Sequence, residues 1–321
     1  MQSTDNNQET IDDEEEDVDD ESFPNMTKSK ILECCKKHDL YIYPELNDTL
    51  YLHYEGFPKI KNLDEFVNLK SLWLNNNQIT TIENLSSLKQ LTSLNLQNNL
   101  ITDITGLEDL TNLNSLMLSN NCISKVSGLS NLKNLVTFEI DYNQVKTADL
   151  LKGILECPSI SVLNIVHNQM DDPEIIEVLS QMPNLKVLRM DCNPIVPHTK
   201  SYRRQMTLKC QKLQYLDDAQ ITDEDRLLVD AWSSGGKKAE MIARQQLKEK
   251  KREKEEKDFK DFRKMQRDAM LRAGGNLKDY PELMSSDDEH NKLDDEEPQS
   301  NNDIEYPKSA EHVGANDNDI E

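Results

Sequence analysis

The sequence predicts an α/β solenoid with short parallel strands on its concave side and 3₁₀ or α-helical returns on its convex side. Three observations lead to this fold class. One eleven-residue frame recurs along the middle of the chain, apolar and polar residues alternate inside it, and an asparagine stands near the end of nearly every copy. A unit that supplies one strand at a time builds an elongated stack in which each copy contacts its neighbours.

The frame is clearest as LKSLWLNNNQI, from Leu69 to Ile79. It returns as LTSLNLQNNLI, LNSLMLSNNCI and LVTFEIDYNQV at steps of 22 residues, and then as ISVLNIVHNQM and LKVLRMDCNPI at steps of 25. A weaker copy, NDTLYLHYEGF, begins at Asn47, so there are seven candidate units. The shared pattern L-x-x-L-x-L-x-x-N-x-I matches the leucine-rich repeat, in which each unit contributes one short parallel strand to a curved stack.

Residue choice inside the unit follows from strand geometry. Leu72 and Leu74 alternate with Trp73, so the leucines face the core and the tryptophan faces outward. The asparagine falls where the chain turns inward, and a buried amide can bond backbone groups that the turn leaves unpaired. The first unit has Glu55 at this place, which predicts an irregular turn. We interpret the others as a structural ladder: Asn77, Asn99, Asn121, Asn143, Asn168 and Asn193.

The returns between strands follow two patterns. In the 22-residue units apolar residues recur every three positions, as at Ile82, Leu85 and Leu88, which suits a 3₁₀ or short helical return. The 25-residue units predict true α-helices, because Asp172 is a candidate N-cap and Pro173 a suitable first helical residue. The apolar stripe of that helix is Ile175, Ile176, Val178 and Leu179.

Both ends of a repeat stack need a cover. Upstream, Thr27 is a candidate N-cap of a helix, and downstream the segment 202–226 can seal the last unit. Asp217 and Asp218 lie in that segment, but no histidine or third carboxylate stands at a useful spacing, so a turn or helix cap is favoured over a metal site or an acid–base pair. The apolar residues of the two caps are Ile31, Leu32, Cys34 and Cys35, and then Met206, Leu208, Cys210, Leu213 and Leu216.

The 321-residue chain has a formal net charge of −23, and this charge is unevenly distributed outside the repeats. Residues 1–22 hold eleven acidic and no basic side chains, and residues 279–321 hold fifteen acidic and two basic, so we expect both ends to be disordered. In the tail, Ser285 and Ser286 precede acidic residues and are either kinase sites or simple linker. The predicted parts are an acidic arm (1–24), an N-terminal cap helix (25–46), the repeats (47–195), a C-terminal cap (196–235), a charged helix (236–273) and an acidic tail (274–321).

The stretch from Lys237 to Arg272 predicts one solvated helix, since it carries fourteen basic and eight acidic residues and has neither proline nor glycine. Pairs such as Glu253 and Lys257 support a helix at a spacing of four. Its apolar residues do not keep a heptad, so a coiled coil is less favoured. The run KKREK suggests a nuclear signal or a nucleic-acid patch, but interleaved glutamates dilute its field and we expect no nucleic-acid partner.

Catalytic and cofactor motifs are missing from the sequence. The six cysteines show no metal-binding spacing, and SSGGKK at 233–238 lacks the upstream glycine and the following Ser or Thr of a phosphate-binding loop. We expect no signal peptide, and the sequence contains no apolar span of 18 residues. These observations predict a non-enzymatic protein of the cytoplasm or nucleus with reduced thiols, no cofactor, no metal and no membrane partner.

The outward strand positions form columns on the concave face, and we take these columns as the candidate surface for a protein partner. Aromatic residues gather at its N-terminal end beside a polar rim, as in many interface hot spots. The plainer interpretation is that Trp73 only lies against side chains of adjacent repeats. The candidate residues are Tyr51, His53, Tyr54, Trp73, Asn95, Met117, Glu139, Asp141, Tyr142, His167 and Arg189.

Three stretches carry a family resemblance: LYIYPELNDTLYLHYEGFPKIKNLDEFVNLKSLWLNNNQITTIENL, the end cap NPI…YRR…LQYLDD…DR, and the exit AWSSGGKKAE. Together, over roughly residues 27–250, they resemble the dynein axonemal assembly factor 1 family of ciliated cells. The resemblance implies a non-enzymatic factor that helps to preassemble dynein arms in the cytoplasm, with the cilium or flagellum as a second location. It implies axonemal dynein subunits, chaperones and other assembly factors as partners. The short acidic tail departs from the family, so a function of a long C-terminal region is not carried over.

Two other functions fit the same fold. Repeats of the 22-residue type also resemble the regulatory subunit of protein phosphatase 1, which would hold an enzyme on its concave face. Acidic tails would also draw basic proteins, as in a histone chaperone. We expect the chain to act as a monomer.

Overall fold

The computed structural model describes residues 24–274. The predicted acidic arm, and the acidic tail with Ser285 and Ser286, lie outside the described residues apart from their innermost positions. The chain divides into two compact units, Met1–Gln245 and Gln246–Glu321, whose described parts are residues 24–245 and 246–274.

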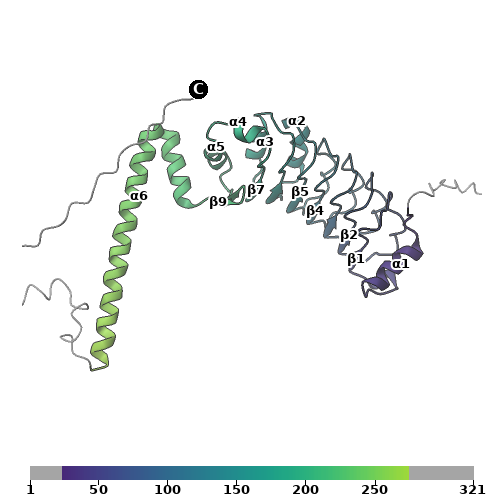
Figure 1. The fold of residues 1–321 in the computed structure, drawn as a ribbon, viewed down its shortest axis with the longest axis horizontal. Helices are drawn as coiled ribbons and strands as arrows, with labels where there is room; N and C mark the ends of the chain where they lie inside the picture. Colours follow the sequence, from purple (N-terminus) through teal and green to yellow (C-terminus); the bar gives the residue numbers. More distant parts are fainter. Residues whose placement is uncertain (1–23, 275–321) are drawn as a thin grey trace, which may run out of the picture. The chain divides into compact units, whose positions relative to one another are not determined.

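The part of the chain from residue 24 to residue 245 is built on one sheet, whose strands follow each other in chain order, as Figure 1 shows. All strands through β8 are parallel, and β9 turns back antiparallel to β8. Seven of them are the predicted repeat strands, and the last two come from the C-terminal cap, where no strand was predicted. They are β1 Thr49–Tyr51, β2 Ser71–Trp73, β3 Ser93–Asn95, β4 Ser115–Met117, β5 Thr137–Glu139, β6 Val162–Asn164, β7 Val187–Arg189, β8 Tyr215–Leu216 and β9 Ala219–Gln220.

The register of the sheet places equivalent residues of neighbouring units side by side. Leu50 pairs with Leu72, and Tyr51 with Trp73. The middle residue of each repeat strand is buried and belongs to one continuous apolar core. Leu72 and Leu74 are 1% and 0% exposed whereas Trp73 between them is only partly buried, so the predicted alternation is confirmed.

The buried asparagines connect adjacent units, as predicted. The side-chain Nδ2 of Asn121 donates to Leu118 O of its own unit and to Leu96 O of the unit before, both at 3.0 Å. Its Oδ1 accepts from Ile101 N at 3.0 Å. The same three bonds recur at Asn77, Asn99, Asn143, Asn168 and Asn193.

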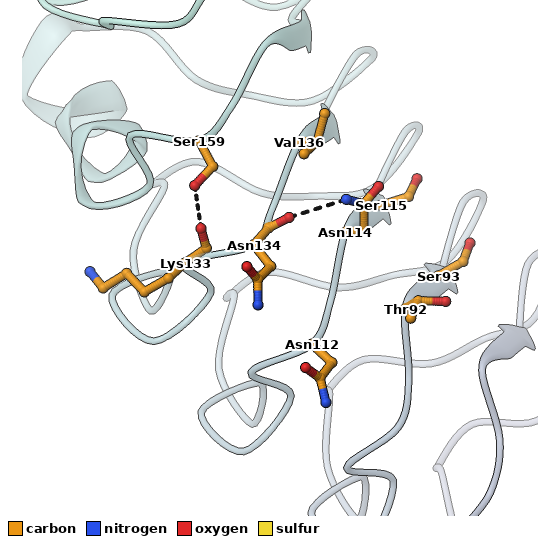
Figure 2. A pocket seen from close by; sticks show the side chains of 9 residues that line it. All are labelled: Thr92, Ser93, Asn112, Asn114, Ser115, Lys133, Asn134, Val136 and Ser159. Carbon is orange, nitrogen blue, oxygen red and sulfur yellow. Dashed lines mark hydrogen bonds between the residues drawn. The ribbon is translucent and has the colours of Figure 1, made fainter.

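A second, outer ladder of amides was not predicted. The Nδ2 atoms of Asn112, Asn134 and Asn184 each donate to a carbonyl of the preceding unit at 2.9 to 3.0 Å, and that of Asn68 donates to Glu45 O of the N-terminal cap at 2.8 Å. Figure 2 shows this strand-start edge, where Asn114 also donates to Asn134 O and Ser159 to Lys133 O. Its sequence signal was an asparagine directly before the first apolar residue of several frames.

The convex returns match the predicted periods. In the regular units Leu88 N bonds Leu85 O and Leu91 N bonds Leu88 O, both at 3.0 Å. These i→i+3 bonds are of 3₁₀ type but do not join into a helix. The longer units carry α2 Ala148–Leu151 with the 3₁₀ helix η2 Lys152–Glu156, and α3 Ile175–Ser180.

The predicted start of α3 was wrong, because the helix begins at Ile175 and Asp172 does not cap it. Ile175 N bonds Asp172 O at 3.1 Å, so a tight turn precedes the helix. The Asp172 carboxylate accepts from Glu174 N and, across the units, from Ala148 N at the start of α2. These backbone donors lower the pKa of Asp172.

The N-terminal cap is the helix α1 Lys28–Lys37, followed by the 3₁₀ helix η1 Pro44–Leu46. Thr27 caps α1 through a bond from Lys30 N, as predicted, and Ile31, Cys34 and Cys35 are buried. The adjoining turn of the first repeat is irregular, as predicted, because Gly56 adds a second positive φ after that of Tyr54.

Glu55 itself links the first repeat to α1. Its carboxylate lies 3.1 Å from the ammonium groups of both Lys30 and Lys37, and its side chain is 11% exposed. Burial alone would raise the pKa of Glu55, but the two lysines hold it below its ordinary value.

The C-terminal cap contains α4 Ile195–His198 and α5 Tyr202–Lys209. Four of its predicted sealing residues are buried, but Leu208 is 37% exposed and does not seal the stack, because α5 turns that position outward. Asp217 and Asp218 form the turn between β8 and β9, with φ of +48° and +63°, so the turn interpretation of this pair is confirmed.

The final helix, α6 Asp223–Arg272, crosses from the first unit into the second and is interrupted by non-helical backbone at Gly235 and Gly236. Its beginning lies within the predicted cap and the rest within the predicted charged helix. Inside the second unit, the guanidinium of Arg263 lies 4.9 Å from the centre of the Phe259 ring.

Replacing a ladder asparagine should destabilise the stack much more than replacing an outer one. In Asn121→Ala the backbone groups of two units lose buried partners, and we expect the free energy of unfolding to fall by roughly 2–4 kcal/mol. In Asn112→Ala only one exposed bond is lost, and the fall should stay below about 1 kcal/mol. Urea unfolding followed by circular dichroism measures both; equal losses would contradict the ladder's role.

Glu55→Gln should destabilise the protein at neutral pH by about 1 kcal/mol, because Lys30 and Lys37 lose a charged partner. The pKa of Glu55 is lowered in the folded state, so its contribution is present above the unfolded-state pKa and is lost as the pH falls through the folded pKa, below 4.5. Urea unfolding at several pH values should show the two proteins converge in acid. Glu156→Gln, at an exposed carboxylate away from these lysines, is the matched control; a difference that grows in acid would refute the assignment.

Candidate functional site

The concave face of the sheet presents the predicted columns. Because the strands are parallel and in register, equivalent side chains of adjacent units lie about 4.8 Å apart. One column holds Tyr51, Trp73, Asn95, Met117, Glu139, Asn164 and Arg189, and the next holds His53, Asn75, Gln97, Ser119, Asp141, Val166 and Asp191.

An aromatic group, defined as His38, Tyr51, His53, Tyr54 and Trp73, forms the N-terminal end of this face. Tyr51 is its centre, with ring centroids 6.2 Å from Trp73, 6.0 Å from His53 and 5.2 Å from His38. His53 and Tyr54 meet edge to face at 5.6 Å. His38 was not predicted; it is the C-cap residue of α1, and the burial of the other side of that helix brings it to the sheet.

His53 is held as a neutral side chain within this group. Burial lowers its pKa, and the nearby His38 and Lys37 lower it further. Its Nδ1, like Oδ1 of the neighbouring Asn75, is buried and has no hydrogen-bond partner within residues 24–274. Such unpaired polar atoms are rare in folded proteins and cost stability.

An acidic hollow of about 440 Å³ lies further along the same face, over strands β3 to β6. Its carboxylates are oriented by neighbours: Asp141 accepts from Asn164 Nδ2 at 3.0 Å and from the Ser119 hydroxyl, and Glu139 accepts from Gln97 Nε2 at 3.4 Å. Burial raises the pKa of Glu139, and the adjacent Asp141 raises it further. The hollow is lined by Gln97, Asn98, Ser119, Asn120, Glu139, Asp141, Tyr142 and Asn164.

A third column lies where each strand turns away, and all of its residues have left-handed backbone with φ between +49° and +60°: Tyr54, Asn76, Asn98, Asn120, Tyr142, His167 and Cys192. Asparagine tolerates this conformation, but bulky residues adopt it rarely. Tyr142 and His167 nevertheless occupy it, and their rings stack at 4.3 Å with an interplanar angle of 19°. This stack stands at the edge of the acidic hollow.

The structure therefore brings most of the predicted residues onto one face, but not all are available to a partner. Asn95 is only 4% exposed, and its Oδ1 accepts from Gln97 N, so it supports the surface from beneath. Arg189 is exposed but lies 3.2 Å from the Asp218 carboxylate. Sequence reasoning missed this pair, because Asp218 comes from the cap rather than from a repeat.

Metal-binding and membrane-crossing features are not found within residues 24–274. No group of three or more potential metal ligands converges there, and no helix in that range is long and apolar enough to cross a bilayer. The cysteines of this part are free thiols, and burial raises the pKa of Cys34, Cys157 and Cys210 to about 11. These three thiols are protonated at neutral pH and unreactive.

Comparison with known proteins finds a matching family model and several similar proteins. A family model of leucine-rich repeats in two copies matches residues 67–109. Dynein axonemal assembly factor 1 of Homo sapiens is 55% identical over 223 residues, which are 70% of this chain and 31% of the human protein. The Mus musculus protein is 55% identical over 70% of this chain and 35% of its own length. The Drosophila erecta homologue is 53% identical over 67% of this chain and 14% of its own.

The matched part of this chain thus spans about a third or less of the length of these relatives. Among solved structures, an internalin of Listeria monocytogenes has a TM-score of 0.42 at 23% identity, covering 62% of this chain and 71% of its own. An internalin C2 of the same organism has a TM-score of 0.44 at 22% identity, covering 60% of this chain and 93% of its own.

The cost of the left-handed column can be measured at a residue without ring contacts. Cys192→Asn replaces an exposed thiol at φ +58° by a residue that, among those with a side chain, tolerates this backbone well, so the free energy of unfolding should rise by about 0.5–1 kcal/mol. Cys122→Asn is the matched control, because Cys122 has no positive φ. Urea unfolding compares them, and equal changes in the two variants would show that the column carries no such cost.

Proposed function

Because this chain is a homologue of dynein axonemal assembly factor 1 over about 70% of its length, we propose that it is a non-enzymatic protein-binding factor required for the cytoplasmic preassembly of axonemal dynein arms. Motility of cilia or flagella would depend on it. Its proposed partners are axonemal dynein subunits together with chaperones and other assembly factors.

The 55% identity is the observation that carries this proposal. All leucine-rich repeats share the apolar positions of the frame. An identity of this level over more than 200 residues must also include many positions outside that frame. The chain matches only about a third of the human protein, so the proposal is confined to what a repeat domain can do, which is to hold another protein.

The concave face supports the proposal because it offers a protein partner a place to bind. The aromatic group combines large apolar area with polar tips, as interface hot spots do. Trp73 lies at one edge of it, on β2, with its ring 6.2 Å from that of Tyr51, and the polar Asn75 and Gln97 stand in the next column. Side chains of this kind gain binding energy without the entropy cost of long flexible residues.

The functional test is loss of the gene in a ciliated cell, followed by electron microscopy of axonemes and affinity purification with the tagged chain. Missing outer or inner arms, together with dynein heavy chains and chaperones in the purified material, are the expected result. Complete arms with intact motility would overturn the proposal. Recovery of protein phosphatase 1 or of histones in place of dynein would replace it with one of the other two functions.

Trp73→Ala should abolish recovery of the partner while leaving the fold intact. The side chain is only partly buried, so the melting temperature should change little, whereas loss of an aromatic anchor costs about 2 kcal/mol or more of binding free energy. Tyr43→Ala, at an aromatic residue 59% exposed in the N-terminal cap, is the matched control and should keep the partner. If Trp73→Ala lowers stability and leaves binding unchanged, the aromatic group serves packing alone.

A further inference from the structure

The concave face joins an aromatic end to an acidic middle, and nothing within the described residues covers either. We propose that it binds a protein segment rich in lysine or arginine, which sets an apolar side chain against the aromatic group and a cationic side chain in the acidic hollow. This inference rests on the proposed function in taking the occupant to be a partner protein, and it adds the chemistry by which that partner is recognised.

Charge complementarity identifies the occupant. Along the concave columns of β1 to β7, the acidic side chains are Glu139, Asp141 and Asp191, and the one basic side chain is Arg189. Arg189 is already paired with Asp218 at 3.2 Å. Glu139 and Asp141 have no cation within ion-pairing distance in the part of the chain that the structure describes, and only neutral groups bond them; the charge of Arg189 acts on Glu139 from further away. An arriving cation would supply the missing partner.

The hollow is organised for a cation before one arrives. Asn164 and Ser119 hold the Asp141 carboxylate, and Gln97 holds that of Glu139, so neither must be ordered when the partner binds. Glu139 is already partly removed from water, which strengthens its attraction for a cation at short range. At the rim, Tyr142 presents an aromatic ring that can add a cation–π contact to a guanidinium or ammonium group.

The turn column places an exposed aromatic ring at each of these two places. Tyr54 belongs to the aromatic group and Tyr142 lines the hollow, and they are 72% and 52% exposed. Tyr54 meets His53 edge to face and Tyr142 stacks on His167, so both rings are positioned before a partner binds.

The distance between the aromatic group and the acidic hollow sets the spacing of the apolar and cationic side chains in the partner. Trp73 on β2 and Glu139 on β5 are three strand steps apart, which is about 14 Å at 4.8 Å a step. An extended segment rises about 3.3 Å per residue, so its apolar and cationic side chains would stand about four residues apart. A helix rising 1.5 Å per residue would need about nine.

Selection from a library of random sixteen-residue peptides, displayed on phage and exposed to the full chain, tests this assignment. We expect enrichment of peptides with lysine or arginine about four or nine residues from an apolar side chain. Affinities of enriched peptides, measured by fluorescence anisotropy, should fall at least about tenfold in E139Q/D141N and also as salt rises from 0.05 to 0.5 M. Both substitutions keep the size of the side chain while removing its charge.

The matched control is D103N/E156Q, which removes the same two charges from exposed positions outside the concave columns and should bind as the unchanged chain does. Circular dichroism and thermal unfolding of both variants check that they fold. Enrichment of neutral or acidic peptides, or equal affinities for the chain and E139Q/D141N, would overturn the inference.

Affinity purification separates this outcome from failure of the proposed function. If dynein subunits are recovered equally with the unchanged chain and with E139Q/D141N, and cationic peptides are not enriched, the inference falls and the proposed function stands. If cationic peptides are enriched and lose affinity in E139Q/D141N, but no dynein subunit is recovered, the surface is as inferred and the proposed function is wrong.

Discussion

The repeat stack depends on the amide of a buried asparagine, which every repeat after the first contains. A single side chain donates to carbonyls of two successive units and accepts from a backbone N–H between them, as Asn121 does with Leu118, Leu96 and Ile101. Leucine could fill the same volume but would leave all three backbone groups unpaired inside an apolar core, which costs more than the amide itself. The hydrophobic ladder supplies the driving force for stacking, and the amide ladder fixes the register at which the units stack.

A fixed register is what turns seven separate strands into a surface. Because equivalent residues stand one strand step apart, a column position can change its side chain without disturbing the core, which uses the alternate positions of each strand. Trp73 and Glu139 occupy the same place in their units and differ completely in chemistry. The core residues make the repeat recognisable, and the columns make this chain differ from other repeat proteins with the same frame.

The regular features of the fold could be predicted from the sequence because their residues recur at a fixed spacing. The strands, the buried leucines, the asparagine ladder and the outward position of Trp73 all follow from the spacing of the frame. The features it did not predict depend on contacts between segments that no period relates. His38 reaches the aromatic group only because α1 packs on β1, and Arg189 finds Asp218 only because the cap adds β8 and β9 to the sheet. Asp172 bonds Ala148 N of a neighbouring unit as well as Glu174 N just before α3, so a rule for local capping did not predict its role.

Neutral polar side chains connect the aromatic group with the acidic hollow. They run from Asn76 into the lining of the hollow and are tied to one another: Asn98 donates to Asn76 at 3.0 Å, Asn120 donates to Asn98 at 2.5 Å, and Asn95 accepts from Gln97 N. These bonds hold the spacing between the ends without offering a charge or a large apolar anchor of their own. Two contacts on a rigid frame cost less entropy to engage than two contacts on mobile loops, because the second forms without further ordering of the protein. Selectivity on such a face comes from the distance between the two anchors as much as from their chemistry, and that distance is set by the same stacked amides that hold the repeats together.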